Sequence, residues 1–503
     1  MKILSIDNVR EADNYTIKNE PVKSIDLMER ASFQLFKWIK KRLNKSATIV
    51  IFAGPGNNGG DGLALARMLH NAKYHVEVKV VKFTDKFSGD FKTNLNSLNE
   101  IDGLHIEEIV DAKKFPNLDD DNVIVDAIFG SGLSRPAEGL AADVIHFINN
   151  QSCVRISIDI PSGLFADKHS ASGIYSIVRA DYTLSFQFPK LAFMFAENDQ
   201  FVGEWHILNI GLHPDFINHV KTNNYYILKE DIVANFHKRL KFSHKGTYGH
   251  ALLIAGSYGK MGAAILASKA CLRSGLGLLH VHIPKVGYQI LQTTCPEAML
   301  SIDRYDNYFS EVPNLAQFNV IGIGPGLGME HQSIMALKLL IQSTKVPLVM
   351  DADALNILAE NKTWMAFLPK NSVLTPHPKE FERIAGKWQN DFEKIELQKA
   401  MAIKHGLIIV LKGAHTSVCL PSGDVYFNST GNPGMATGGS GDVLTGLITG
   451  LIASGYSSAK AAIIGTYIHG MAGDFASTKL GQNAMIAGDI VDKIPKAMKQ
   501  FFD

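Results

Sequence analysis

Short apolar runs that end in glycine, asparagine or aspartate recur along the chain and predict strands buried in parallel sheets. Residues 24–40 instead place apolar side chains three and four positions apart, which predicts an amphipathic helix with Ser24 as its N-cap. Residues 63–70 carry a second helical pattern. Strands are predicted at 48–53, 75–81, 123–126 and 155–159. Because strands that alternate with helices are typical of βαβ units, the first half is predicted to be an α/β domain.

The alternation restarts after a polar stretch, residues 213–230, which we interpret as a linker. Strands are predicted at 251–254, 278–283, 320–323, 348–350 and 407–411. Two very apolar segments, 443–454 and 459–476, are predicted to be buried helices. Each half carries its own glycine-rich segments, so the sequence predicts two α/β domains, at 1–218 and 226–503.

The composition is that of a globular protein and its charge is balanced. Of the 503 residues, 46% are apolar and 20% are charged, which is enough for more than one hydrophobic core. Lys plus Arg number 50 and Asp plus Glu number 49, so the net charge is only +1. Such a balance provides no electrostatic basis for binding nucleic acid or an anionic membrane. We expect small-molecule partners and a homo-oligomer.

Cysteine usage and the N-terminus bear on the compartment. The four cysteines are widely separated and form no C-x-x-C pair, which favours a reducing compartment over a disulfide framework. The first residues, MKILSIDN, become polar too early for a signal peptide. No stretch of 18 consecutive apolar residues is present, so no membrane helix is predicted. The sequence therefore predicts a cytoplasmic protein.

Polar segments follow three predicted strands of the first half. The segment 54–62 (GPGNNGGDG) is rich in residues that can turn backbone N–H groups toward an anion at a helix N-terminus. Asp126 and Asp159 each stand at the carboxyl end of a predicted strand, where ligands bind in open α/β sheets. Each aspartate by itself could also be a helix cap or a turn former. Together, carboxylate, amide and backbone oxygens are ligands for a hard cation.

These segments, with DAIFGSGLSRP at 126–136 and SIDIPSG at 157–163, resemble the epimerase domain of the bifunctional NAD(P)H-hydrate repair enzymes. The resemblance implies a Rossmann-like three-layer αβα domain that interconverts the R and S forms of hydrated NADH and NADPH (NADHX and NADPHX). It implies a potassium ion (K⁺) held by Asn58, Asp126 and the backbone near Ser162. We predict Asp159 as the residue that moves the proton. The implied dinucleotide-binding residues are Asn57, Asn58, Gly59, Gly60, Asp61, Gly130, Ser131, Gly132, Leu133, Ser134, Arg135, Pro136 and Asp159.

The second half carries a pattern suited to phosphoryl transfer. The string NPGMATGGSGD at 432–442 precedes an apolar helix, and its small residues let N–H groups converge on an anion at the helix N-terminus. We predict Asp442 as a general base there, although an isolated aspartate could merely favour the helix macrodipole. His377 stands between two prolines, which stiffen the backbone on both sides. The turn KGAHT at 412–416 follows a predicted strand and is predicted to contact a nucleotide.

The GGSGD string resembles the anion-binding motif of ribokinase-like kinases, and with TPHP and NPGMAT it is similar to the ADP/ATP-dependent NAD(P)H-hydrate dehydratases. Ser440 stands where threonine is common and Ala255 where glycine is common, and both departures are conservative. The resemblance implies a ribokinase-like αβα domain. The implied substrate-binding residues are Ala263, Gly326, His377 and Asp442. The implied nucleotide-binding residues are Lys412, Gly413, Ala414, His415, Thr416 and Gly441.

Together the two resemblances imply a bifunctional enzyme for repairing hydrated nicotinamide cofactors. The dehydratase would phosphorylate the hydroxyl of the S epimer with ADP or ATP and Mg²⁺, and phosphate, a better leaving group than hydroxide, would then depart. The epimerase would supply that epimer from the R form. The alternative is a ribokinase-like small-molecule kinase fused to a non-catalytic dinucleotide-binding module. A kinase would turn over its own acceptor, whereas a repair enzyme would consume nucleotide only when the hydrate is present.

Overall fold

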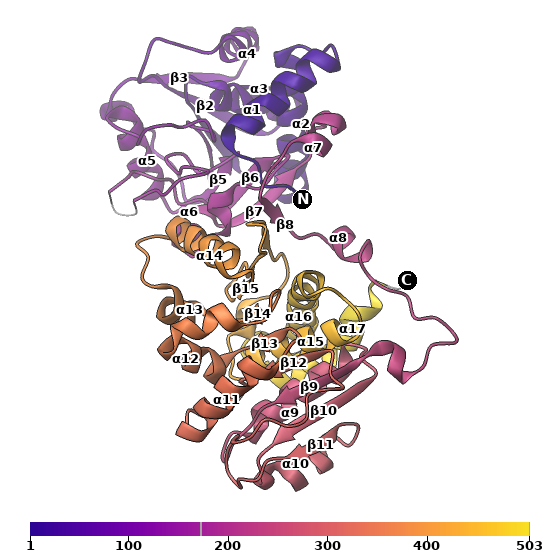
Figure 1. Cartoon of the computed structure of the whole chain (residues 1–503). Coiled ribbons are helices and arrows are strands. Elements are labelled where there is room, and N and C mark those ends of the chain that lie inside the picture. Colours follow the sequence, from indigo (N-terminus) through magenta and orange to yellow (C-terminus); the bar gives the residue numbers. More distant parts are fainter. Residues whose placement is uncertain (172–173, 502–503) are drawn as a thin grey trace. The chain divides into compact units, whose positions relative to one another are not determined.

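The computed structural model of the chain describes residues 1–171 and 174–501 and divides into two compact units (Figure 1). The N-terminal unit comprises Lys2–Thr222 and the short segment Asn390–Phe392. The C-terminal unit comprises Met1, Asn223–Gln389 and Glu393–Asp503. Each unit has its own sheet, so each is described by itself.

The N-terminal unit is built on a sheet of seven parallel strands in the order β3-β2-β1-β4-β5-β6-β7. The strands are β1 (Thr48–Ala53), β2 (His75–Val81), β3 (His105–Ile109), β4 (Val123–Ala127), β5 (Val154–Ile158), β6 (Tyr182–Phe186) and β7 (Glu204–Leu208). The strand order reverses between β1 and β4, and ligands of open α/β sheets bind at such points. The segments that follow β1, β4 and β5 therefore meet at one edge of the sheet.

Helices cover both faces of this sheet (Figure 1). They are α1 (Ile6–Asn19), α2 (Ser24–Arg42), α3 (Asn57–Asn71), α4 (Gly89–Asn99), α5 (Leu140–Asn149), α6 (Asp199–Val202) and α7 (Pro214–His219). Ile49 and Ile51 of β1 belong to a core shared with α2, α3 and α4. Val50 and Phe52, which alternate with them, belong to a second core with α5. Burial on both faces explains the unbroken apolar run of β1 and confirms the predicted Rossmann-like three-layer αβα fold.

The C-terminal unit contains a sheet of ten strands in the order β11-β10-β9-β12-β13-β14-β15-β16-β17-β8. The strands are β8 (Asn224–Tyr226), β9 (His250–Ile254), β10 (Leu278–Ile283), β11 (Met299–Ile302), β12 (Val320–Ile323), β13 (Leu348–Met350), β14 (Val373–Leu374), β15 (Ile408–Leu411), β16 (Ser417–Cys419) and β17 (Val425–Phe427). The strands from β11 to β15 run parallel, β16 is antiparallel to β15 and β17, and β8 is parallel to β17. The carboxyl ends of β9, β12, β13, β14 and β15 therefore share one edge.

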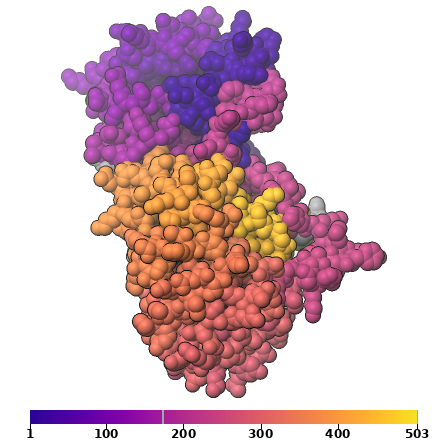
Figure 2. All heavy atoms as spheres, in the orientation of Figure 1, coloured from indigo at the N-terminus to yellow at the C-terminus, as the bar shows by residue number. Residues whose placement is uncertain are grey.

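Helices also cover both faces of this sheet, as expected for the predicted ribokinase-like αβα fold (Figure 1). They are α8 (Lys229–Val233), α9 (Met261–Arg273), α10 (Tyr288–Thr294), α11 (His331–Ser343), α12 (Ala352–Glu360), α13 (Pro378–Ala385), α14 (Asp391–His405), α15 (Ser440–Ala453), α16 (Ser458–Leu480) and α17 (Ala487–Lys499). Ala251 and Leu253 of β9 pack in one core with α9, α15, α16 and α17. The alternating Leu252 and Ile254 point to the other face of the sheet and are equally buried. The chain between α8 and β9, drawn in pink, protrudes from the surface of this unit (Figure 2).

Two expectations about local structure were wrong. Lys23, not Ser24, occupies the N-cap position of α2, and the Ser24 hydroxyl instead donates a hydrogen bond to Asp90 over 2.6 Å. The predicted glycine loop at 54–62 is a loop only as far as Gly56, because α3 begins at Asn57 rather than near residue 63. The polar stretch 213–230, interpreted above as a linker, contains the boundary between the two units, and it also holds α7, β8 and the start of α8.

Candidate active sites

A cavity of about 580 Å³ opens at the carboxyl edge of the N-terminal sheet. Ten of the residues predicted to bind the dinucleotide line it, and they come from the segments after β1, β4 and β5: Asn57, Asn58, Asp61, Gly130, Ser131, Gly132, Leu133, Ser134, Arg135 and Asp159. Gly59, Gly60 and Pro136 do not line it. Gly59 instead packs against the segment that follows β1, since a Cβ on Gly59 would lie 1.7 Å from the Gly54 carbonyl oxygen. Within α3, close packing rather than ligand contact accounts for the glycines.

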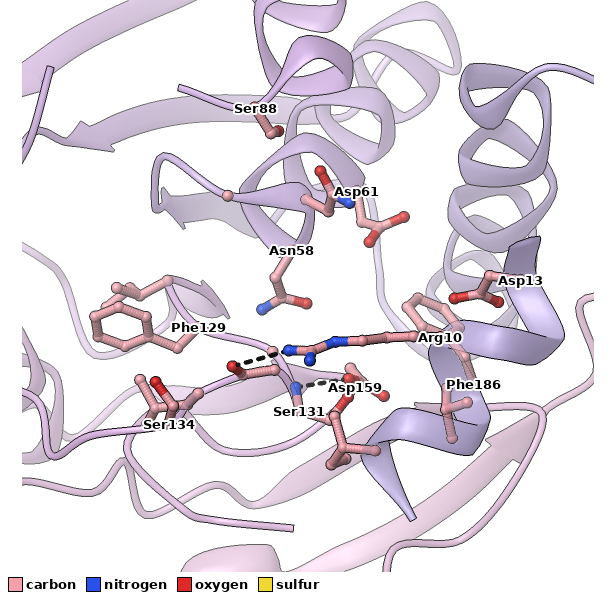
Figure 3. A pocket seen from close by; sticks show the side chains of 18 of the residues that line it. Arg10, Asp13, Asn58, Asp61, Ser88, Phe129, Ser131, Ser134, Asp159 and Phe186 are labelled. Carbon is pink, nitrogen blue, oxygen red and sulfur yellow. Dashed lines mark hydrogen bonds between the residues drawn. The ribbon is translucent and has the colours of Figure 1, made fainter. Parts of the chain in front are cut away.

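Asp159 lines this cavity (Figure 3) and is held by two charge-assisted contacts. Lys190 Nζ lies 2.8 Å from one carboxylate oxygen, and the Ser131 N–H donates to the other over 2.9 Å. Lys190 is 1% exposed, so its charge acts in a poorly screened environment. Burial by itself would raise the pKa of Asp159, but Lys190 and Ser131 outweigh burial and lower it. Asp159 therefore carries an ionised carboxylate at neutral pH.

The backbone of Asp159 is also unusual. Its φ is +67°, a left-handed conformation that is costly for a residue with a Cβ. Strained residues of this kind cluster at functional sites, where the surrounding structure holds them. Gly130 closes over the same carboxylate, since a Cβ on Gly130 would lie 3.3 Å from Asp159 Oδ2 and 3.3 Å from the Asn58 Cβ. The geometry thus brings Asn58, Gly130 and Asp159 together, as the sequence predicted.

Asp126 and Ser162, the other predicted ligands of a cation, lie beneath the cavity and do not line it. The Asp126 carboxylate is fully buried and accepts hydrogen bonds from Ser157, from the backbone of Ile128, and from both the N–H and the hydroxyl of Ser162. Burial raises the pKa of Asp126 despite these bonds. Four donors occupy about all the positions at which a carboxylate accepts hydrogen bonds. A cation at Asp126 would have to displace one of them.

Two observations show that the donor set still fits a hard cation. The Asn58 side-chain nitrogen is buried and has no hydrogen-bond partner among the residues that the structure describes. Rotating the amide by half a turn would place its oxygen in the same space. The Ser162 hydroxyl has a second acceptor, the Phe129 carbonyl oxygen at 3.2 Å, so it can turn and free an oxygen of Asp126. Oxygen atoms from carboxylate, amide and hydroxyl groups are then available together.

Arg10, Asp13 and Lys190 are among the residues of this cavity that the sequence analysis missed. Arg10 and Asp13 belong to α1, a helix with few apolar residues that the hydrophobic pattern did not reveal. Arg10 donates to the Gly132 carbonyl across the cavity (Figure 3). Lys190 follows β6 in the sequence QFPK, where a lysine directly after a strand-end proline could have suggested a placed side chain.

The second site lies where the strands of the C-terminal unit end. Asp351 follows β13, Lys412 follows β15, and Lys412 Nζ lies 2.8 Å from Asp351 Oδ1. Thr445 of α15 donates to the other oxygen of Asp351 over 2.7 Å. A Cβ on Gly441 would lie 3.2 Å from Lys412 Nζ and 3.3 Å from Asp351 Oδ2. The first turn of α15 therefore lies directly against a buried lysine–aspartate pair.

Asp442 lies in that first turn of α15. The N-cap, Gly439, has φ +92°, a left-handed conformation that glycine adopts without steric cost. Burial, reinforced by the nearby Asp351 and opposed by Lys412, raises the pKa of Asp442 to about 7. A group whose pKa matches the ambient pH is well suited to accept a proton. The position and the charge environment of Asp442 therefore support the predicted general base.

His377 is a helix cap in the structure. Its Nδ1 accepts hydrogen bonds from the N–H groups of Lys379 and Glu380 at the start of α13. Burial and the nearby Lys412 lower the pKa of His377, so the imidazole is neutral at pH 7. Glu380 Oε2 lies 3.8 Å from Lys412 Nζ, which places His377 and Lys412 in one neighbourhood. The rigid mounting predicted from the two prolines takes the form of this cap.

The remaining predicted residues lie at the same edge. Gly326, in the segment after β12, faces α9, since a Cβ there would lie 3.1 Å from the Ala263 Cβ. The turn after β15 places Gly413 and Ala414 at the surface, and Thr416 is buried and bonds back to Gly413. His415 Nδ1 lies 3.0 Å from the Asn428 carbonyl oxygen, so its imidazole is tied to the protein.

The sequence analysis assigned no role to Asp351, Asp353, Glu380 or Thr445. Asp353 accepts from the Gly328 N–H over 2.8 Å and pairs with Lys260 at 3.3 Å. The two aspartates after β13 were visible as a pattern, but only the tertiary structure shows that one faces Lys412 and the other Lys260.

No helix within 1–171 or 174–501 combines the length and apolar character that crossing a bilayer requires.

Comparison with known proteins assigns a family to each half of the chain. The family model described as YjeF-related protein N-terminus matches residues 24–192, and the one described as NAD(P)H-hydrate dehydratase matches residues 251–496. The bifunctional NAD(P)H-hydrate repair enzyme of Moorella thermoacetica is 34% identical, over 99% of this chain and 97% of its own length. The enzyme of that name from Thermofilum pendens is 33% identical, over 99% of this chain and 96% of its own length.

A solved structure matches the second half. The ADP/ATP-dependent NAD(P)H-hydrate dehydratase of Bacillus subtilis, co-crystallized with ATP/Mg²⁺, is 30% identical, with a TM-score of 0.48. The match covers 56% of this chain and 100% of that chain. The full-length relatives extend over both units described above. This chain therefore belongs to the family of bifunctional NAD(P)H-hydrate repair enzymes.

Proposed function

We propose that this chain interconverts the R and S epimers of NADHX and NADPHX in its N-terminal unit and dehydrates the S epimer in its C-terminal unit, at the expense of ADP or ATP. The observation that carries the proposal is the pairing of two sites in one chain. One is a cavity at a strand-order reversal with an ionised Asp159. The other is a partly buried carboxyl, Asp442, at the N-terminus of α15.

In the dehydratase site, Asp442 accepts the proton of the substrate hydroxyl as that oxygen attacks the terminal phosphoryl group. The backbone N–H groups at the start of α15 stabilise the charge on the phosphoryl oxygens. Lys412 keeps its positive charge, because Asp351 and Glu380 outweigh burial and raise its pKa, and it supports the phosphate from the opposite side. Loss of phosphate then restores the ring double bond.

The same unit supplies carboxylates for Mg²⁺. Mg²⁺ is usually held by one or two carboxylates together with substrate phosphates and water. Asp351 and Asp353, which follow β13, fit that requirement, and the ion would neutralise charge on the nucleotide. The segment 412–416 at the end of β15 contacts the nucleotide, and His377, Gly326 and Ala263 contact the hydrated cofactor.

In the epimerase site, the residues lining the cavity bind the hydrated dinucleotide, and Asp159 moves the proton. Asn58, Asp126 and Ser162 hold the potassium ion, which would position the substrate rather than polarise it strongly. The support is the unpartnered amide of Asn58 and the second acceptor available to the Ser162 hydroxyl. The protein acts on small molecules in the cytoplasm.

The proposal is tested by mixing hydrated cofactor epimers with the protein, Mg²⁺ and either nucleotide, and following the absorbance of reduced nicotinamide. We expect the S epimer to be consumed with nucleotide, and the R epimer to be consumed as well without an added epimerase. Nucleotide hydrolysis should require the hydrate. A ribokinase-like kinase with an inert N-terminal unit would instead leave both hydrates untouched and phosphorylate another acceptor.

A further inference from the structure

The epimerase cavity contains carboxyl groups beyond Asp159. Asp13 of α1 and Asp61 of α3 line the same cavity as Asp159 (Figure 3). Asp13 lies on a different element from the family sequence motifs quoted above, in a helix that the hydrophobic pattern did not predict. The Asp13 carboxyl forms no hydrogen bond or ion pair with the residues that the structure describes. It is therefore available to a bound molecule.

The chemistry of the substrate requires two proton-moving groups. Addition of water to the nicotinamide ring of NAD(P)H places a hydroxyl on a carbon bonded to the ring nitrogen. Inversion at that carbon can proceed by loss of the hydroxyl as water and addition of water to the opposite face. The departing oxygen needs an acid and the incoming water needs a base. One ionised aspartate cannot serve both steps at once.

The charges around the cavity separate the two roles. Lys190 holds Asp159 in its ionised form, as described above. Burial raises the pKa of Asp13 to about 6, with Lys190 opposing and Asp159 adding to the shift. Burial, together with Asp159, Asp13 and Asp90, also raises the pKa of Asp61. Like charges that share one site resist ionising together, so protons are retained on the carboxyls that lack a cationic partner.

We propose that Asp13 is the second catalytic residue of the epimerase, a general acid that works opposite the base Asp159, and this assignment rests on the proposed function. Asp13 is only partly buried on its helix and faces the cavity (Figure 3). Asp61 is 9% exposed and lies within α3, so it is less accessible to a substrate than the partly exposed Asp13. In this assignment Asp61 influences the charge of the site but does not transfer a proton to or from the substrate.

The step balances in atoms and electrons. The Asp13 proton passes to the hydroxyl oxygen, the carbon–oxygen bond breaks, and its electron pair leaves with water. The lone pair of the ring nitrogen forms a carbon–nitrogen double bond. Water then adds to the opposite face, the double-bond pair returns to nitrogen, and Asp159 takes the surplus proton. Proton exchange with solvent restores both carboxyls, and the reverse reaction exchanges their roles.

The test compares Asp13→Asn with Asp13→Glu, Asp61→Asn and the control Glu11→Gln, an exposed position on the same helix. Epimerisation is measured from pH 5 to 9, with dehydration of the S epimer as an internal standard. For Asp13→Asn we expect kcat to fall by about 10²–10⁴-fold, the usual contribution of a positioned acid, with KM within a few-fold. The wild-type epimerisation rate should decline as the pH rises above about 6, because activity needs Asp13 protonated. We call this decline the alkaline limb, and we expect Asp13→Asn to lack it.

Asp13→Glu should recover part of the rate and the alkaline limb, while Asp61→Asn and Glu11→Gln should keep the limb. A folded Asp13→Asn protein within a few-fold of wild type, or loss of the limb in Asp61→Asn alone, would overturn the assignment. When the wild-type reaction is run in H₂¹⁸O, the newly formed epimer should contain ¹⁸O in its hydroxyl. An unlabelled epimer would overturn the proposed loss and addition of water, and this measurement needs no variant. Absence of epimerisation in wild type would instead refute the proposed function, which distinguishes the two failures.

Discussion

At the scale of single residues, two aspartates show how the environment assigns roles to the same side chain. Asp159 and Asp442 both follow a strand or begin a helix, and both are largely buried. Asp159 has Lys190 at 2.8 Å and a lowered pKa. Asp442 is not paired to Lys412, which bonds to Asp351 instead, and its pKa rises to about 7. Whether a lysine pairs directly with the aspartate therefore decides which of these carboxyls is ionised.

Asp442→Asn preserves the shape of the side chain and removes its basicity. Since a positioned base contributes about 10²–10⁴-fold, roughly 3–5 kcal/mol of barrier, we expect dehydration of the S epimer to slow by about that factor. Nucleotide affinity should change little, because the phosphoryl contacts are backbone N–H groups. Single-turnover dehydration and nucleotide titration check this, with epimerisation in the same protein as the control. Dehydration within a few-fold of wild type would show that Asp442 only begins a helix.

The raised pKa of Asp442 also predicts a pH dependence. A base must be ionised, so the dehydration rate should rise with pH up to about 7 and level off above it. Asp442→Asn should lack this rise. Rates of the S epimer at saturating nucleotide, measured from pH 5.5 to 8.5, check the expectation, and a rate independent of pH below 7 would contradict it.

Substitutions of Asn58 and Asp126 both test the cation site, and we expect them to differ in their effect on stability. Asn58→Ala removes an amide nitrogen that has no partner, so we expect little loss of stability and a marked loss of potassium-dependent epimerisation. Asp126→Ala should lose the same activity but also unfold at lower temperature, because it leaves the buried donors of Ser157 and Ser162 unsatisfied, at about 1–3 kcal/mol each. Potassium titrations and thermal unfolding separate the two effects. Loss of S-epimer dehydration in a folded Asn58→Ala protein would contradict the assignment.

At the scale of elements, close helix packing positions the second site. Gly446 and Gly450 lie one turn apart in α15, and the structure places α9 against them. A Cβ on Gly446 would lie 2.0 Å from the Ala267 carbonyl oxygen. The helix α15, which carries Asp442 in its first turn, is therefore held in place by its close contact with α9.

Gly446→Ala should force α15 and α9 apart. We expect a loss of about 1–3 kcal/mol, typical of overpacking, which is roughly 2–10 °C in the unfolding temperature of a unit of this size. Gly488→Ala in α17 is the matched control, since a Cβ there meets nothing within 4 Å. Thermal inactivation of dehydration and of epimerisation is measured separately. The idea fails if Gly446→Ala and Gly488→Ala inactivate at the same temperature.

At the scale of the whole molecule, two separate sheets and two sets of cores predict that each unit folds by itself. The proposed boundary, 1–218 and 226–503, is best tested with a cut between Thr222 and Asn223. That cut keeps all of β8, which pairs with β17 at the edge of the C-terminal sheet.

Homo-oligomerisation and a cytoplasmic location stay predictions.

Residues 1–222 expressed alone should epimerise, and residues 223–503 alone should dehydrate the S epimer. We expect each fragment to be soluble and to show one cooperative unfolding transition. Activity assays and thermal unfolding of both fragments check this against the full chain. Aggregation of both fragments beside a well-behaved full chain would mean that the units do not fold independently.

The sequence by itself determined the fold class, most strands and the family. Runs such as 48–53 and 278–283 are strands with those bounds, because burial on both sheet faces leaves an unbroken apolar signature. The family follows from short motifs rich in glycine and aspartate, which can be read directly from neighbouring positions in the sequence. Ten of the predicted epimerase residues line one cavity because parallel strands bring their carboxyl ends to one edge.

Only the tertiary structure decided which charges meet. Lys190 pairs with Asp159, Lys412 with Asp351, and Asp13 reaches the epimerase cavity from a helix without a strong apolar stripe. These contacts join residues far apart in the chain, and no local pattern encodes a distance between them. The protonation of a buried carboxyl depends on those distances, so the assignment of acid and base came from the fold and not from the motifs.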